Sequence, residues 1–261
     1  VERPVERLVV ASSMSIYGEG LYADAEGAPR EAGARTSAQL AAGRWDIEDA
    51  AGRPLVPVPT PERKTPMPAS VYALGKYDQE RMCLTVGGAY GVPSVALRFF
   101  NIYGPRQALS NPYTGVLAIF ASRYLNGKPP LVYEDGRQRR DFVHVSDVAR
   151  ACRLSLERPD VDGEVFNIGS GESITVLEVA AQLAQALGID GPQAQLTGEY
   201  RVGDIRHCFA DITRARALLG YAPQVPLAAG LQELVDWMTG QSAFDRVDDM
   251  RAELARRGLQ R

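Results

Sequence analysis

Two short segments of the chain carry hydroxyl and amine groups that are suited to proton transfer. One is Ser12-Ser13-Met14-Ser15-Ile16-Tyr17-Gly18, and the other is Tyr72-Ala-Leu-Gly-Lys76. Tyr72 and Lys76 are four residues apart and would share one face of a helix. A tyrosine with a pKa of about 10 is a poor base at neutral pH, but a nearby ammonium favours the phenolate. With a hydroxyl from Ser13 on the substrate oxygen, these groups could take a proton from an alcohol while a hydride leaves the same carbon.

A Tyr-x-x-x-Lys pair by itself usually marks a solvated helix face, and a Ser-rich turn is usually only a loop. The order of the elements favours the catalytic interpretation. A short buried strand is expected over Arg7–Ser12, directly before the Ser-rich turn. Periodicity predicts a helix from Ser70, a plausible N-cap, to about Tyr90, and Val95–Phe100 reads as a second apolar strand.

The elements on either side of these segments predict the fold class. Residues 19–68 have little periodicity and indicate a long excursion, with Pro54–Pro61 extended. After residue 115, strands and helices alternate, which is typical of a parallel sheet flanked by helices. We expect strands at 130–133, 141–145, 165–168 and 207–210, and helices at 116–126, 146–157 (capped by Ser146), 175–187, 213–219, 227–239 and about 244–257.

Composition excludes several classes of protein. The chain has 261 residues, 45% hydrophobic and 23% charged, with a net charge of -3, so it is neither disordered nor basic enough to indicate a nucleic-acid partner. Three Cys and two His in no metal-ligand spacing argue against a disulfide framework, a metal site and a Ser-His triad. With no long apolar run and no signal peptide, we expect a cytoplasmic protein without membrane contact.

The ordered motifs resemble the extended short-chain dehydrogenase/reductases, in the nucleotide-sugar epimerase/dehydratase group. Besides the two segments above, the matching blocks are 97–106 (Leu-Arg-Phe-Phe-Asn-Ile-Tyr-Gly-Pro-Arg), 140–148 (Arg-Asp-Phe-Val-His-Val-Ser-Asp-Val), 166–171 (Phe-Asn-Ile-Gly-Ser-Gly), 201–204 (Arg-Val-Gly-Asp) and 211–220. The turn at 169–171 lacks the third glycine of a dinucleotide loop and reads as a tight turn.

The resemblance implies a role for each matching residue. Tyr72 would be the general acid/base, Lys76 would bind the nicotinamide ribose and tune Tyr72, and Ser13 would hold the sugar hydroxyl. Ser12 and Phe100 would also contact NAD. The nucleotide sugar would be bound by Asn101 and two arginines at its diphosphate, Arg140 and Arg201, whose planar forks match phosphate oxygens. Tyr133 would stack on the pyrimidine base, or else be a core aromatic, and Asp204 would bind a ribose.

The residues after Ser13 narrow the reaction. Related 4,6-dehydratases carry Asp and Glu there, and sugar-acid decarboxylases keep the Glu, but this chain has Met14 and Ser15. Met14 cannot transfer a proton, so the resemblance favours 4-epimerisation of a dTDP- or UDP-linked sugar through a 4-keto intermediate. A 4-ketoreductase or dehydrogenase, and a non-catalytic nucleotide-sugar-binding relative, stay open as alternatives.

Two further segments resemble the subgroup that contains dTDP-L-rhamnose 4-epimerases and UDP-glucose 4-epimerase-like proteins. They are 109–116 and 203–207, and the long excursion at 19–68 is also similar to that subgroup. Some members of the subgroup carry a Cys-x-x-Cys pair in this excursion. This chain has no Cys there, so we expect no metal. The family's glycine-rich cofactor turn has no counterpart before Ser12. We therefore expect an incomplete Rossmann-like doubly wound sheet, from a partial chain that is inactive alone.

The resemblance also implies a division of the chain. Residues 1–103 and 139–169 would be the C-terminal part of the NAD-binding domain, with 19–68 inserted. Residues 104–138 and 170–261 would form a smaller α/β region that binds the nucleotide sugar. A homodimer is a family expectation only.

Overall fold

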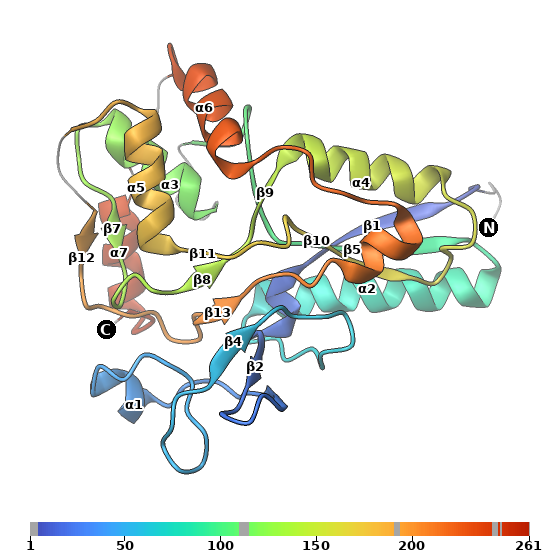
Figure 1. Ribbon diagram of the computed structural model, residues 1–261, viewed down its shortest axis with the longest axis horizontal. Coiled ribbons are helices and arrows are strands. Elements are labelled where there is room, and N and C mark those ends of the chain that lie inside the picture. Colours follow the sequence, from blue (N-terminus) through green and yellow to red (C-terminus); the bar gives the residue numbers. More distant parts are fainter. Residues whose placement is uncertain (1–4, 110–114, 191–193, 242–244, 246, 261) are drawn as a thin grey trace.

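The computed structural model describes residues 5–109, 115–190, 194–241, 245 and 247–260. Three parallel strands form the central sheet in the order β1 (Leu8–Ser13), β5 (Ser94–Phe99) and β10 (Val165–Ile168). Helix α2 (Val71–Tyr90) covers one face and α4 (Val145–Glu157) the other (Figure 1). This arrangement confirms the expected Rossmann-like sheet.

The strands of this sheet end together. Ser13 of β1 and Ile168 of β10 both pair with Phe99 of β5, so the carboxyl ends of all three strands meet at one edge. Val95 and Leu97 are completely buried because helices cover both faces of the central strand. In open α/β sheets, ligands bind at this edge.

Helix α2 begins where the sequence predicts. The Ser70 hydroxyl oxygen accepts a hydrogen bond from the backbone N–H of Ala73 at 3.1 Å, and Gly91 ends the helix in the left-handed conformation (φ 66°). The expected Ser146 cap of α4 is wrong. The side chain of His144 caps this helix instead, because its Nδ1 accepts from the Ser146 backbone N–H at 3.4 Å.

A second layer of elements packs beside the sheet around its own core (Figure 1). Its helices are α3 (Val116–Leu125), α5 (Val176–Ala186), α6 (Leu227–Met238) and α7 (Val247–Arg256). Two pairs of short strands lie here, β6 (Asn101–Tyr103) with β9 (Phe142–His144) and β7 (Leu131–Val132) with β12 (Gln195–Leu196). A three-stranded sheet has β8 (Arg139–Arg140) between β11 (Ile174–Thr175) and β13 (His207–Cys208). The segment expected as a helix at 213–219 is π-helical over Ala215–Leu219 (η2).

The segment 19–68 folds further than its sequence indicates. Strand β2 (Leu21–Ala23) pairs on both sides, with β3 (Pro29–Glu31) and β4 (Val56–Val58), and α1 (Ser37–Ala41) follows β3. Three-residue strands are too short to show an alternating pattern, which explains why periodicity missed them. The expected extended conformation of Pro54–Pro61 is confirmed at β4. The proposed division of the chain into two domains stays a prediction.

Candidate active site

The proton-transfer residues of the sequence lie where β1 meets α2. Ser13 is the last residue of β1, and the 3-10 turn η1 (Met14–Tyr17) follows it. Tyr72 lies in the first turn of α2 and is 58% exposed. Lys76, one turn later, donates from Nζ to the backbone oxygen of Ala11 in β1 at 3.0 Å. The ammonium of Lys76 therefore ties α2 to the strand that ends at Ser13.

The two serines at the end of β1 differ in their surroundings. Ser13 Oγ accepts from the backbone N–H of Ser15 at 3.2 Å and lies 3.1 Å from Ser15 Oγ. Ser12 is buried, and its Oγ has no hydrogen-bond partner within the described chain. A buried hydroxyl without a partner is costly, so Ser12 Oγ is suited to a ligand that supplies one.

A cavity of about 200 Å³ brings together residues that lie far apart in the sequence. Apolar side chains from α3, β7 and α7 form much of its wall. Five of the residues expected to bind the nucleotide sugar line it: Asn101, Tyr133, Arg140, Arg201 and Asp204. The structure thus gathers these residues at one site, although their roles stay predictions.

Three polar atoms of the cavity residues are buried without a partner in the described part of the chain. They are Asn101 Oδ1, Gln138 Oε1 and Arg201 Nε. Two of them can accept a hydrogen bond and one can donate. Because unpaired buried polar groups are rare and costly, these atoms mark the cavity as a binding site for a polar ligand.

Tyr133 and Arg201 form one wall of this cavity. The guanidinium carbon of Arg201 lies 4.5 Å from the centre of the Tyr133 ring, and its Nη2 donates to the Tyr133 hydroxyl at 3.3 Å. The same hydroxyl lies 3.3 Å from Gln260 Oε1. Tyr133 is therefore an aromatic at the wall of a cavity and not a core residue of a strand.

Arg140 is engaged by the protein backbone. Its Nη1 donates to the carbonyl oxygen of Arg206 at 3.0 Å, and its Nη2 donates to that of Ile205. These bonds hold the segment that follows Asp204. The role of Arg140 as a diphosphate ligand stays a prediction, and Arg201 has the freer guanidinium of the two.

Phe100 lies away from this cavity. It is buried in the core beneath the sheet edge, with its ring 6.5 Å from that of Tyr17. It directly follows β5, one residue after the partner of Ser13. Its contact with the nicotinamide stays a prediction.

Sequence reasoning missed a buried carboxylate at the same sheet edge. Asp141 accepts from the backbone N–H groups of Ser170 at 2.6 Å and Gly171 at 2.9 Å. A Cβ on Gly169 would lie 2.5 Å from Asp141 Oδ2, so only glycine fits there. The expected tight turn at 169–171 is thus held by Asp141, and burial raises the pKa of this carboxyl to about 6.

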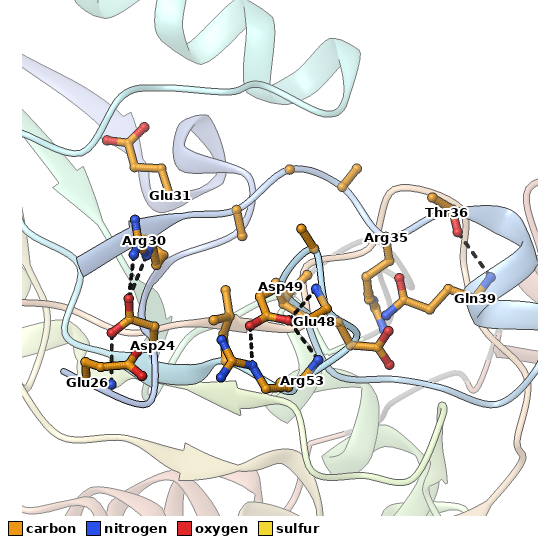
Figure 2. A pocket seen from close by; sticks show the side chains of 17 residues that line it. Asp24, Glu26, Arg30, Glu31, Arg35, Thr36, Gln39, Glu48, Asp49 and Arg53 are labelled. Carbon is orange, nitrogen blue, oxygen red and sulfur yellow. Dashed lines mark hydrogen bonds and ion pairs between the residues drawn. The ribbon is translucent and has the colours of Figure 1, made fainter. Parts of the chain in front are cut away.

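A second, larger cavity lies within the segment 19–68 and has a volume of about 630 Å³. Figure 2 shows that charged side chains around it pair with one another. Arg30 contacts Asp24 at 2.7 Å, and Arg53 contacts Asp49 at 2.7 Å. Because these partners already satisfy the charges, this cavity is a weaker candidate for a ligand than the first.

The described residues contain neither a membrane-spanning helix nor a cluster of metal-ligating side chains. None of their helices is long and apolar enough to cross a membrane. No group of three or more His, Cys, Asp or Glu side chains among them could hold a metal ion.

The fold agrees with that of known proteins. Residues 50–169 match the model of the NAD dependent epimerase/dehydratase family. The chain belongs to this family.

Several relatives are epimerases of nucleotide sugars, and others are dTDP-glucose 4,6-dehydratases. The chain is 38% identical to a dTDP-L-rhamnose 4-epimerase of Burkholderia thailandensis over 90% of this chain and 63% of that protein. It resembles the UDP-glucose 4-epimerase of Thermotoga maritima, solved with UDP-glucose (TM-score 0.70, 32% identity, 90% of this chain and 64% of that chain). It also resembles MoeE5 in complex with UDP-glucuronic acid and NAD (TM-score 0.70, 32% identity, 92% and 67%). The chain thus spans a little under two thirds of the first two proteins.

Proposed function

We propose that this chain carries the nucleotide-sugar site of an NAD-dependent enzyme that epimerises a dTDP- or UDP-linked sugar at C4. The observation that supports this most is the cavity that joins Asn101, Tyr133, Arg140, Arg201 and Asp204. Its orphaned acceptors and donor suit a ligand that has both N–H groups and anionic oxygens. A nucleoside diphosphate has both.

In this proposal the pyrimidine stacks on Tyr133 and the diphosphate reaches Arg201 and Asn101. A guanidinium recognises phosphate oxygens through parallel hydrogen bonds, and this fixes the sugar in one orientation. Asp204 accepts from a ribose hydroxyl. The sugar then extends toward the end of β1, where Ser13 lies.

In this proposal Tyr72, Lys76 and Ser13 carry out the proton transfer. Tyr72 takes the proton of the C4 hydroxyl as general base, and Lys76 lies one turn later on the same helix, with its Nζ hydrogen-bonded to the backbone oxygen of Ala11. Ser13 donates a hydrogen bond to the C4 oxygen. The 4-keto sugar then rotates in the site, and Tyr72 returns the proton to the C4 oxygen as the opposite epimer forms.

NAD fits the residues at the end of β1. Ser12 Oγ, buried and without a partner in the described chain, and Lys76, fixed on β1, would hold its nicotinamide end. When bound, NAD supplies the hydride acceptor and donor at C4. Met14, which is buried and cannot transfer a proton, argues against a dehydratase.

The test is to incubate the purified protein with NAD and, in parallel, UDP-glucose and dTDP-L-rhamnose, and to follow the sugars by NMR. The chain alone is expected to be inactive, and we expect the C4 epimer of one sugar to form, without net consumption of cofactor, once the cofactor-binding part of a relative is joined to it. A product that forms only with stoichiometric reduced cofactor would indicate a 4-ketoreductase. If the nucleotide sugar binds but no epimer forms even in that joined protein, a non-catalytic role is the better account.

A further inference from the structure

A buried carboxylate joins the segment 19–68 to the wall of the nucleotide-sugar cavity. Glu134 directly follows Tyr133 and is almost completely buried. Its Oε1 lies 2.8 Å from Nη1 of Arg35, and its Oε2 lies 2.9 Å from Nη1 of Arg206. Both guanidinium groups are also buried, with 2% and 1% of their side chains exposed.

Arg35 also contacts the backbone of Asp204, a residue that lines the cavity. Its Nη2 donates to the backbone oxygen of Asp204 at 3.0 Å, and its Nη1 donates to that of Trp45 at 3.1 Å. Asp204 lines the nucleotide-sugar cavity. One guanidinium from the segment 19–68 therefore contacts the residue beside Tyr133 and the backbone of Asp204 at once. Figure 2 shows this side chain extending from the edge of the second cavity.

The backbone at Glu134 is held in an unfavourable conformation. Its φ is 53°, in the left-handed region that non-glycine residues rarely adopt. Its backbone N–H donates to the oxygen of Glu199 at 2.8 Å, which ties it to the segment that leads to Arg201. Such strain persists only where the surroundings over-determine it, and it clusters at ligand sites.

A buried ion pair of this kind contributes little to the net free energy of folding. Hydrophobic residues of similar volume are often as stabilising, because burying two charges costs about as much as their attraction returns. What an arginine adds is a rigid fork that binds several acceptors in one fixed geometry. Here the acceptors are Glu134, next to Tyr133 in the chain, and the backbone of Asp204, and Tyr133 and Asp204 both line one cavity.

We propose that Arg35 is a positioning residue for the nucleotide-sugar site. Through Glu134 and the Asp204 backbone it fixes the spacing between Tyr133 and the Arg201–Asp204 segment, so that the nucleotide meets both at once. This inference rests on the proposed function, because it assumes that a nucleoside diphosphate occupies the cavity. It makes the segment 19–68 part of substrate binding, although that segment supplies none of the expected ligands.

The test measures the affinity of the full chain for UDP by calorimetry, well below the melting temperature of each variant. Arg35→Ala should weaken UDP about tenfold. Arg44→Ala is the matched control, because Arg44 lies in the same segment and pairs only at the surface with Glu48. This control should bind UDP as the wild type does. If Arg35→Ala does not fold, Arg35→Lys keeps the charge beside Glu134 but cannot reach the other acceptors, and it should weaken UDP several-fold.

A double-mutant cycle with Arg201→Lys separates positioning from a general loss of structure. If Arg35 acts by positioning Arg201, Arg35→Ala should weaken UDP binding by less than about twofold in the Arg201→Lys background. Unchanged UDP affinity in the Arg35 variants, or effects that multiply in the double variant, would overturn the inference. If the wild type itself binds neither UDP nor dTDP, the proposed function fails instead.

Discussion

The guanidinium carbon of Arg201 lies over the ring of Tyr133, 4.5 Å from its centre, although the two residues are 68 positions apart. A cation over an aromatic face is attracted by the ring, and the arrangement fixes both side chains. Because Arg201 Nε is buried and has no partner in the described chain, the pair presents an unused donor at the cavity. We infer from this pair that Tyr133 and Arg201 form the centre of the proposed nucleotide site.

Replacing Arg201 should therefore damage nucleotide binding more than the fold. We expect Arg201→Ala to weaken UDP or dTDP at least about tenfold, which corresponds to about 1.4 kcal/mol. Isothermal titration calorimetry measures this change. Arg137→Ala, an exposed arginine near the same cavity, is the control and should leave the affinity within about twofold. Equal effects of the two variants would argue against a specific role for Arg201.

Arg140 should behave differently, because its donors are bound to the backbone oxygens of Ile205 and Arg206. Arg140→Ala leaves these oxygens without their donor, which should lower the free energy of unfolding by about 2 kcal/mol. For a chain of this size, that lowers the melting temperature by roughly 4–8 °C. Thermal unfolding followed by circular dichroism checks it. A variant with unchanged melting temperature but weaker UDP binding would show that Arg140 is chiefly a ligand.

The proton-transfer role of Tyr72 predicts a loss of turnover without loss of structure. Tyr72 is largely exposed, so Tyr72→Phe should leave the melting temperature unchanged. General acid/base catalysis contributes about 10²–10⁴-fold, and in the chain joined to the cofactor-binding part of a relative we expect the epimerisation rate to fall by at least about 100-fold. Tyr90→Phe, at the exposed far end of the same helix, is the matched control. Full activity of Tyr72→Phe would remove Tyr72 from the mechanism.

Asp141 should make stability depend on pH in a defined window. Burial raises its pKa from 3.8 to about 6 in the folded protein. Its contribution is therefore fully present below about pH 4, where the carboxyl is protonated in both states. It is lost as pH rises through 6, by about 3 kcal/mol in total.

Urea unfolding at pH 4 and pH 6.5 tests this for Asp141→Asn, which cannot titrate. The stability of the variant relative to the wild type should rise by about 2 kcal/mol between the two pH values. Asp236→Asn, an exposed residue of α6, should show no such difference. Parallel pH profiles of the wild type and Asp141→Asn would mean that Asp141 is ionised at little cost in the folded state.

Much of the architecture could be predicted from local signals. The Ser70 cap and the periodicity after it located α2, and the apolar run at 95–100 located β5, because each pattern reflects the burial of one face or of both. The strands at 21–23, 29–31 and 56–58 could not be predicted, since three residues show no period. Their pairing depends on contacts between distant parts of the segment.

The site was predictable to a similar extent. Motif order indicated Tyr133, Arg201 and Asp204, which the structure brings to one cavity. It could not indicate Gln138, Glu134 or Arg35. Their importance lies in an unpaired atom, a left-handed backbone and a buried ion pair, and each of these exists only once the chain has folded.

The most direct test of the account is a calorimetric titration of the wild-type chain with UDP and dTDP, with uridine as the comparison. We expect saturable binding of at least one diphosphate at one site per chain, and much weaker binding of uridine, which lacks the groups that Arg201 and Asn101 would contact. If neither diphosphate binds, or if uridine binds equally well, the cavity around Tyr133 and Arg201 is not a nucleotide-sugar site.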